Sequence, residues 1–516
     1  MLLRRFFELI GIYAAEPQPK AARGPVLLSK SKYLIGLQCP KALWISYNNK
    51  KVIPAIDART SAIFEQGHEV GTWAKRLFTN GLDLGQLEGF DEPVRATQAA
   101  LATNRALFEA AFVFERCFSR ADILEPVGNG FWDIIEVKSS TGVKPVYLGD
   151  LAFQRYVYEG TGLRIRRCYL LHINNRYVRN GIVDPVALFS KIDVTQAVAE
   201  LMATVEPKVR EMFHVIDSVS CPEVKISTHC NTPYECSLKV VCWKFLPNPS
   251  VFDLRRAGKK AWELLNQTVM KIDEIPTDFS LNELQSRQVA SHRSGTPHVD
   301  AVAICAFLRR LVYPLYFLDF ETVQPAIPFY DRSRPYGQIP FQFSLHKVEF
   351  EGALPAHFEF LVEGCADPRP DLLCQLANLL ENSGSIIGYN VDFEVACLKE
   401  CVSVFPQYQD WFESLLPRFV DLYDLFDDFS YYHPSQNGSA SLKAVLPALT
   451  GVDYGELEIG SGDFAQREFV RITFGQVMST ERARVRAALR AYCGRDTGGL
   501  IDMLRALEKL VAGPIR

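Results

Sequence analysis

The stretch Leu315-Tyr-Phe-Leu-Asp319-Phe-Glu321-Thr322 is an apolar segment that ends in two carboxylates spaced two residues apart. Its apolar and aromatic composition is typical of a buried β-strand. Residues i and i+2 of a strand point to the same face, so Asp319 and Glu321 are expected to project together. Carboxylate oxygens are the ligands that Mg²⁺ and Mn²⁺ prefer. This stretch therefore predicts an acidic metal site at the end of a sheet strand.

A later segment adds acidic residues to this candidate site. A second buried strand is expected over Ser385–Asn390, followed by a helix that begins near Asp392 and Glu394. Acids that converge on Asp319 from there would cost several kcal/mol of mutual repulsion unless cations neutralise them. The helix start therefore extends the predicted metal site.

The last part of the chain is expected to be mostly helix over Arg484–Leu510, with Tyr492 and Asp496 one turn apart on one face. Two Mg²⁺ ions held by acids from a strand, a helix start and this helix would suit phosphodiester hydrolysis. Taken singly, each acid could instead end a strand or lie in solvent. From Pro314 onward, strands alternate with amphipathic helices, which predicts an α/β domain.

A second charged group lies in the amino-terminal half of the chain. Gly128-Asn-Gly130 is a strong turn signal between two strand-like segments and predicts a β-hairpin. Asp122 on one arm can then meet Glu136 and Lys138, which share a face of the other arm. The two carboxylates would hold Mg²⁺ or Mn²⁺, and the lysine can orient water and offset phosphate charge. A surface cluster of salt bridges is the alternative for so loose a pattern.

Helices are predicted on both sides of this hairpin. The following helix carries Gln154 and Tyr158 as an i,i+4 pair on one face, and a basic strand comes next. Upstream, a helix is expected over residues 63–78, with Ile63, Phe64, Val70, Ala74 and Leu77 on its apolar side. His68 lies at the edge of that side and is either a structural residue or a metal ligand.

The cysteines form a third candidate site. Cys230, Cys236 and Cys242 are spaced six residues apart, and Cys39 lies much earlier in the chain. The close cysteine pairs of most zinc sites are absent. A bound metal and buried free thiols both remain open for this set. Cys221 lies near the set, whereas Cys117 and Cys168 fall in expected strands and are assigned to the core.

Length and composition are those of a multidomain globular protein. The chain has 516 residues, of which 48% are hydrophobic and 22% charged, so two or three domains are expected. No run approaches the ~18 apolar residues of a membrane span. Thirteen cysteines, an odd number, favour reduced thiols or metal ligands in the cytoplasm. The net charge of −4 excludes a uniformly basic surface but permits a local positive groove for nucleic acid.

The carboxy-terminal acids resemble the DEDD exonucleases, a ribonuclease H-like family that includes polymerase proofreading domains and ribonuclease D. Its motifs correspond here to Asp319-Phe-Glu321, Asn390-Val-Asp392-Phe-Glu394 and Tyr492-xxx-Asp496. The resemblance implies Mg²⁺ or Mn²⁺ binding by four acids and a Tyr492 that positions the nucleophilic water. The implied metal ligands are Asp319, Glu321, Glu394 and Asp496. Glu394 stands at the second-motif acid position, and Asp392 is the competing candidate.

The amino-terminal set resembles the PD-(D/E)XK nuclease core of the RecB type, which includes a CRISPR-associated exonuclease. The residues that carry this resemblance are Arg120-Ala-Asp122, Glu136-Val-Lys138 and Gln154-xxx-Tyr158. The resemblance implies metal ligation by Asp122 and Glu136, a catalytic Lys138, and nucleic-acid positioning by Gln154 and Tyr158. RecB-type enzymes add a histidine from an upstream helix as a metal ligand, and His68 is the candidate here.

The cysteine set is similar to the iron–sulfur staple of part of the RecB-type family. That similarity implies that Cys39, Cys230, Cys236 and Cys242 hold a cluster, most simply 4Fe-4S, that clamps the ends of the nuclease domain together. Zinc is the alternative metal. The gap between the first two clustered cysteines is longer here than the family's usual two residues.

The two resemblances together imply a fold and a function. The expected layout is a leader (1–27), a PD-(D/E)XK nuclease with a cysteine-bound cluster (28–247), a helical connector (248–313) and a ribonuclease H-like α/β domain (314–516). The combination resembles an uncharacterised bacterial family that fuses these two nuclease types. It implies a cytoplasmic, metal-dependent exonuclease that hydrolyses phosphodiester bonds at two sites, with DNA expected over RNA and no membrane partner. A ribonuclease in RNA processing and a nucleic-acid-binding scaffold with one active site are the alternatives.

Overall fold

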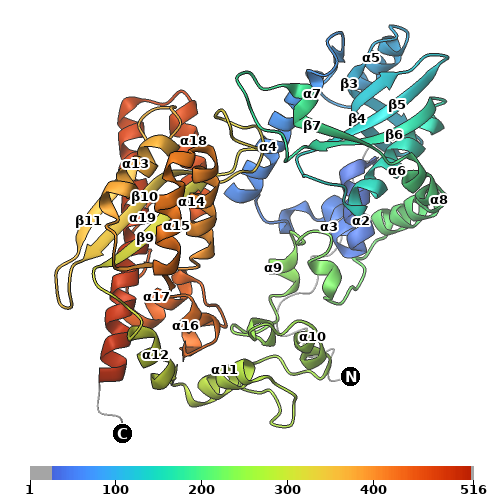
Figure 1. Cartoon of the computed structure of the whole chain (residues 1–516). Helices are drawn as coiled ribbons and strands as arrows, with labels where there is room; N and C mark the ends of the chain where they lie inside the picture. Colours follow the sequence, from blue (N-terminus) through green and yellow to red (C-terminus); the bar gives the residue numbers. More distant parts are fainter. Residues whose placement is uncertain (1–25, 513–516) are drawn as a thin grey trace. The chain divides into compact units, whose positions relative to one another are not determined.

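The structure is a computed structural model that describes residues 26–512, so the expected leader lies almost wholly outside the described part. The chain divides into two compact units (Figure 1). The described first unit comprises residues 26–56, 64–175 and 184–243, and the second comprises 57–63, 176–183 and 244–512. Helices and strands mix in both units, which confirms the expected α/β class.

The sheet of the first unit has the strand order β2-β3-β4-β5-β6-β7, and β1 also pairs with β4. Its strands are β1 (Leu28–Ser29), β2 (Leu82–Asp83), β3 (Leu107–Phe114), β4 (Cys117–Pro126), β5 (Phe131–Lys138), β6 (Arg164–Ile173) and β7 (Phe189–Asp193). Strands β4 and β5 are antiparallel, with Ile123 opposite Ile135, which confirms the predicted hairpin. Strand β6 then pairs with β5 in parallel, so the intervening chain must cross over the sheet.

A crossover helix, α6, makes that connection and packs against the sheet (Figure 1). Its first residue is Pro145, a position where the missing backbone N–H costs nothing, and Leu151, Phe153 and Val157 are buried in the core of this unit. Helices α2 and α8 pack against α6 in turn. The helices of this unit are α2 (Lys30–Gln38), α3 (Pro40–Asn48), α4 (Ala58–Lys75, which belongs to this unit from Phe64 onward), α5 (Asp91–Leu101), α6 (Pro145–Gly160), α7 (Pro185–Leu188), α8 (Thr195–Asp217) and α9 (Lys239–Cys242).

Two details of the first unit bear on the sequence predictions. Cys117 and Cys168 are buried in β4 and β6, so their assignment to the core is confirmed. The helix expected over 63–78 is α4, but the apolar side predicted for it is partly wrong, because Ile63 and Phe64 are exposed. Only its later turns bury apolar side chains.

The sheet of the second unit has the order β11-β10-β9-β12-β13. Its strands are β9 (Leu315–Val323), β10 (Ile339–Val348), β11 (Ala356–Leu361), β12 (Ser385–Gly388) and β13 (Phe419–Asp421). Strands β9 and β11 run antiparallel to β10, which lies between them, and β12 is parallel to both β9 and β13. Strand β9, predicted from the opening stretch of sequence, is therefore central in a mixed sheet.

Alternate residues of β9 point to opposite faces of this sheet. Three of them join the apolar core that includes residues of α13 and α14: Tyr316, Leu318 and Phe320. Leu315 and Phe317 join a second core with residues of α17 and α19. Asp319 and Glu321 continue the face of Leu315 and Phe317, so the two acids lie on the side of the sheet that α19 covers.

The long helix α19 packs along β9 and β10 (Figure 1). The helices around this sheet are α13 (Arg369–Leu379), α14 (Asp392–Val404), α15 (Gln409–Leu415), α16 (Asp424–Asp427), α17 (Leu442–Thr450), α18 (Gly462–Phe474) and α19 (Ser479–Ala512). The expected helix over Arg484–Leu510 is confirmed within α19, and the expected helix start near Asp392 is confirmed in α14.

The stretch 248–313, predicted as a helical connector, lies in the second unit and has an apolar core of its own. Buried residues of that core include Val251, Leu264, Ile275 and Val289. Its helices are α10 (Lys259–Asn266), α11 (Glu283–Ser294) and α12 (Ala301–Leu308), and a short strand β8 (His298–Val299) pairs with β14 (Tyr431–Tyr432).

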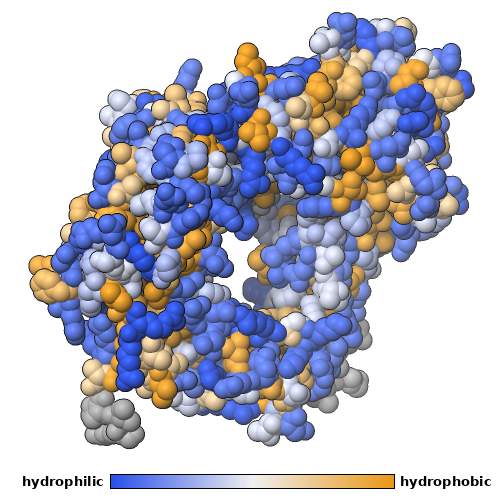
Figure 2. Space-filling view, viewed as in Figure 1, coloured by the Kyte–Doolittle hydropathy of each residue, from blue (hydrophilic) through white to orange (hydrophobic). Residues whose placement is uncertain are grey.

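Between residues 26 and 512, no helix is both long enough and apolar enough to span a membrane. In the view of Figure 2, hydrophilic residues predominate and hydrophobic ones occur in small separate groups. Scattered apolar residues of this kind are normal on protein surfaces.

Two candidate metal sites and a cysteine-lined cavity

The hairpin of the first unit brings Asp122, Glu136 and Lys138 together. Oδ2 of Asp122 accepts a hydrogen bond from the backbone N–H of Val137 at 2.8 Å, which holds its carboxylate beside β5. Nζ of Lys138 donates to Oε1 of Glu136 at 2.7 Å. The spacing predicted from the sequence therefore produces a cluster with opposite charges in contact.

Helix α6 supplies three more polar groups to this cluster. Nε2 of Gln154 donates to Oε2 of Glu136 at 2.7 Å and to Oδ1 of Asp150 at 3.1 Å. Asp150 also accepts from Nζ of Lys138 at 2.9 Å. The hydroxyl of Tyr158 donates to Oε1 of Gln154 at 3.2 Å. Gln154 and Tyr158 are both fully buried, so they hold the acids in place from within the protein and expose no surface to a nucleic acid.

Lys30, the first residue of α2, also reaches this cluster. Its Nζ lies 3.0 and 3.1 Å from the two carboxylate oxygens of Glu136 and 3.4 Å from Oδ1 of Asp122. At the other end of the same helix, Cys39 is the C-cap residue, and its backbone N–H donates to the carbonyl of Ile35. Helix α2 therefore links this charged cluster to the cysteine set.

The charges of the first site shift one another's pKa values. Burial and the neighbouring Glu136 raise the pKa of Asp122 to about 7. Burial alone would raise the pKa of Glu136, but Lys138 and Lys30 hold it well below its usual range. Burial alone would lower the pKa of Lys138, but Glu136 and Asp150 raise it above its usual value. Lys138 is therefore a permanent cation here.

His68 does not join this cluster. It is exposed on α4, and its Nδ1 contacts the carbonyl oxygen of Phe64 at 2.8 Å, one turn earlier in its own helix. In the described part of the chain, no hydrogen bond connects its ring to Asp122 or Glu136. The structure thus assembles the predicted Asp122–Glu136–Lys138 core without the predicted histidine.

The donor set of the first site fits a hard divalent cation. The carboxylate oxygens of Asp122 and Glu136 lie close enough together that one ammonium group, that of Lys30, contacts both side chains. Mg²⁺ and Mn²⁺ favour such carboxylate oxygens.

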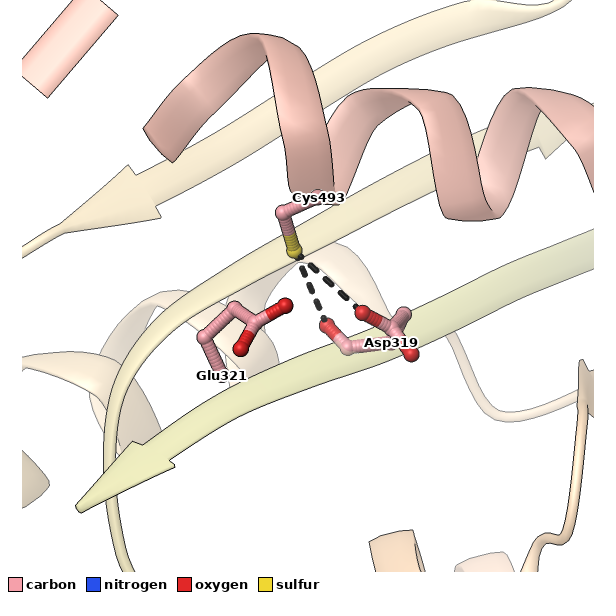
Figure 3. A group of neighbouring side chains, drawn as sticks. All are labelled: Asp319, Glu321 and Cys493. Atoms are coloured by element: carbon pink, nitrogen blue, oxygen red, sulfur yellow. Dashed lines mark hydrogen bonds between the residues drawn. The ribbon is translucent and has the colours of Figure 1, made fainter. Parts of the chain in front are cut away.

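In the second unit, β9 and α19 bring Asp319, Glu321 and Cys493 together (Figure 3). One ligand atom of each lies within 4.8 Å of the others. The Cys493 thiol reaches down from α19 and donates to Oδ2 of Asp319 at 3.4 Å. The i,i+2 spacing predicted for the two acids is thus realised, and the thiol is an addition that the motif did not indicate.

Glu394 faces the same group from the first turn of α14. Its side chain is buried, with 3% exposed, and its Oε2 has no hydrogen-bond partner. Burial and the charge of Asp319 raise its pKa well above the usual value. Asp392, the competing candidate, is exposed on the same turn. Of the two acids, the structure brings Glu394 to the site.

Asp496 and Tyr492 come from one face of α19. The hydroxyl of Tyr454, which follows α17, donates to Oδ1 of Asp496. Burial raises the pKa of Asp496 to about 6, and hydrogen bonds from Tyr454 and Tyr492 oppose that rise. Burial and Asp496 hold the pKa of Tyr492 far above its usual value, so its hydroxyl stays protonated. Nζ of Lys443 lies 5.0 Å from the centre of the Tyr492 ring.

The four acids of the second site destabilise one another's charged forms. Burial and Asp496 raise the pKa of Asp319, and burial, Asp319 and Asp496 raise the pKa of Glu321, both well above their usual values. The carboxylates are buried together, and Oε2 of Glu394 has no hydrogen-bond partner. Such a group needs protons or cations to balance its negative charge. The donor set, oxygen atoms from a strand and two helices, fits divalent metal binding.

The four predicted cysteines surround one small cavity in the first unit. Its lining includes Cys39, Cys230, Cys236 and Cys242, with Lys41 and Lys239 beside them. All four thiols are free. Burial raises the pKa of Cys236 and Cys242, and the neighbouring Cys39 and Cys230 raise both further. Free thiols gathered from distant parts of the chain around one space fit a metal group, which would stabilise their ionised forms.

The loop of the cavity is fixed to α2. Nε2 of Gln38 donates to the backbone carbonyls of His229 and Tyr234, each at 2.8 Å. Cys221 belongs to the same apolar cluster as Cys39 but does not line the cavity.

Four residues that contact the two acidic sites were not predicted from the sequence: Asp150, Lys30, Tyr454 and Cys493. Asp150 precedes Gln154 by four residues, so the helical spacing that identified Tyr158 could have identified it as well. Lys30 and Tyr454 carry no such local signal, because only the tertiary fold brings them to the acids.

Comparisons with known proteins give a family match within the second unit, together with more distant likenesses. Residues 316–441 match a family described as "Domain of unknown function (DUF2779)". A relative from Mycoplasma pneumoniae, "Uncharacterized protein MG366 homolog", is 25% identical over 207 residues, which are 36% of this chain and 31% of the relative. The match thus spans about a third of the relative's length. A solved structure titled "Crystal structure of SSO0001" aligns with 48% of this chain and 95% of its own, at 12% identity and a TM-score of 0.22.

Proposed function

We propose that this chain is a metal-dependent nuclease with two hydrolytic sites, one in each unit. The observation that carries the proposal is the convergence of Asp319, Glu321, Glu394 and Asp496 from three different elements. Burying so many carboxylates together is costly, and a pair of divalent cations is the simplest way to offset the cost. Such a pair supplies an activated water and stabilises the leaving oxygen of a phosphodiester.

In the second site, each side chain has a separate task. The four acids would hold the metal ions, with Asp319 central because its charge affects both Glu321 and Glu394. Tyr492 stays protonated near neutral pH, so its hydroxyl can orient the nucleophilic water by hydrogen bonding but does not serve as a base. A mixed sheet with Asp319 and Glu321 on its central strand suits the ribonuclease H-like family that the motifs resemble.

In the first site, the acids Asp122 and Glu136 would hold the metal. Lys138 is a permanent cation and therefore offsets phosphate charge or orients water, and it does not serve as a base. Gln154 and Asp150 position Glu136 and Lys138 from behind. The hairpin, crossover helix and parallel strand are elements compatible with a PD-(D/E)XK nuclease.

We assign the cysteine cavity to an iron–sulfur cluster. Tetrahedral zinc at about 2.3 Å from each sulfur would bring the sulfurs to about 3.8 Å from one another. Across residues 26–512, no three of these sulfurs come within 4.8 Å of one another, so they are spread more widely than a single zinc ion requires. A multi-iron cluster fits that wider spacing better than a single ion does.

A substrate panel tests the function. Wild type, Asp319→Asn, Lys138→Met and the double variant would be incubated with end-labelled single-stranded DNA, duplex DNA and single-stranded RNA, each with Mg²⁺ or Mn²⁺. Each single variant is expected to lose the cleavage products of one site, and the double variant is expected to give no cleavage products. Asp410→Asn and Lys208→Met, away from both sites, are the matched controls. Unchanged cleavage by the double variant would contradict the proposal, and the preferred substrate would decide between DNA and RNA.

A further inference from the structure

Lys30 reaches both candidate metal ligands of the first site with one ammonium group. Its Nζ contacts Oε1 and Oε2 of Glu136 and Oδ1 of Asp122 at 3.0, 3.1 and 3.4 Å. The Glu136 side chain is almost wholly buried, with 2% exposed, so water screens this contact poorly. In the described part of the chain, the Lys30 ammonium donates to no group other than these two carboxylates.

Lys138 differs from Lys30 in one respect that matters for metal binding. It touches Glu136 too, but it also donates to Asp150 at 2.9 Å. When a metal binds both Glu136 and Asp122, Lys138 would keep Asp150 as a buried partner, whereas Lys30 would lose both of the carboxylates that it contacts. The two lysines therefore cannot respond alike to a divalent cation.

A lysine ammonium and a divalent cation seek the same oxygen atoms and repel each other in a buried site. A metal that bridges Asp122 and Glu136 must therefore displace Lys30. The flexible four-carbon stem of lysine allows that withdrawal without a change in the backbone.

We infer that Lys30 is an internal counter-ion that competes with divalent metal for Asp122 and Glu136 and so weakens the metal affinity of the first site. This inference rests on the proposed function, since it takes this pair of acids as a metal site. Before metal binds, the Lys30 ammonium holds the two carboxylates together, and metal binds by exchange with this ammonium.

Metal binding, measured apart from cleavage, tests this exchange. The full-length chain with Asp319→Asn and Asp496→Asn, which remove the second site, would be titrated with Mn²⁺ at pH 8, where protons compete least. Free Mn²⁺ would be followed by electron paramagnetic resonance. Four variants would be made in this background. Lys30→Met removes the charge, and the more conservative Lys30→Gln does the same in case methionine impairs folding. Lys30→Arg preserves the charge, and Lys32→Met on the same helix is the matched control.

Lys30→Met and Lys30→Gln are expected to bind Mn²⁺ about tenfold more tightly than the background protein. Lys30→Arg and Lys32→Met should stay within about twofold of it. Unchanged or weaker binding by both neutral variants overturns the inference while leaving the proposed function standing. A different result would contradict the metal site itself. If neither the background protein nor any Lys30 variant binds Mn²⁺, or if Glu136→Gln leaves their binding unchanged, Asp122 and Glu136 do not form a metal site. The proposed function of this unit is then wrong as well.

Discussion

The carboxylate of Asp421 accepts a hydrogen bond from the backbone N–H of Asn390 at 2.9 Å. Its other oxygen accepts from the next N–H, that of Val391, also at 2.9 Å. The pair holds Asn390 in a left-handed conformation with φ of 72° at the end of β12. That turn starts α14 so that Glu394, and not the exposed Asp392, faces Asp319.

Replacement of these two acids should therefore have unequal effects. Glu394→Gln is expected to lower the second site's cleavage rate by at least about 100-fold, because it removes a charged ligand from the metal set. Asp392→Asn, the matched control on the same helical turn, should stay within about twofold of wild type. Rates would be measured with saturating Mg²⁺ in a Lys138→Met background. A larger loss in Asp392→Asn than in Glu394→Gln would show that the second-motif acid is misassigned.

The raised pKa of Asp496 predicts how pH affects the metal-free protein. Its folded pKa of about 6 lies above the ordinary value of 3.8, so the folded state binds the proton more tightly than the unfolded state. This contribution to stability is full below about pH 4 and is lost as the pH rises through 6. Between pH 5 and pH 8 the loss from Asp496 alone is about 1.4 kcal/mol.

Denaturant unfolding in EDTA measures this loss. The free energy of unfolding of wild type, relative to that of Asp496→Asn, is expected to fall between pH 5 and pH 8. Added Mn²⁺ should restore it at pH 8, because metal replaces the lost proton. A difference that stays constant with pH would mean that Asp496 ionises normally.

The cysteine cavity predicts which thiols hold the cluster. In anaerobically purified protein, Cys242→Ser is expected to lose bound iron and the visible absorbance of a cluster, because it removes one of four ligands. Cys221→Ser is the matched control, since Cys221 lies in the same apolar cluster but outside the cavity lining. Equal iron loss in both variants would contradict the proposed ligand set, and bound zinc in place of iron would reassign the metal.

Asp150 is predicted to position Lys138. Asp150→Asn should lower the turnover rate of the first site by about 10–100-fold, because it removes the second partner of the Lys138 ammonium. Mn²⁺ affinity should change much less than turnover, since Asp150 is not a proposed ligand. Glu159→Gln, farther along α6, is the matched control. A fall in Mn²⁺ affinity as large as the fall in turnover would instead make Asp150 a ligand.

Local patterns predicted much of both sites, and tertiary packing decided the rest. The i,i+2 spacing of Asp319 and Glu321 and the turn before Phe131 are short-range signals, and the structure realises both. The helix that carries His68 was also predicted. Which of its sides is buried depends on neighbours distant in sequence, however, and Ile63 and Phe64 on the predicted apolar side are exposed. Lys30 is far from its acids along the chain, so only the packing of α2 against α6 and β4 could reveal it.

Helix α2 carries Lys30 at its first residue and is followed at once by Cys39. Its nine residues form a rod about 13 Å long, whose hydrogen bonds resist bending and stretching. A shift of the backbone at Cys39 would therefore also move the backbone at Lys30. The cysteine cavity and the charged cluster around Glu136 are thus joined by a single helix. Oxidation of Cys39 that displaced the end of α2 would also change the position of the Lys30 ammonium beside Glu136.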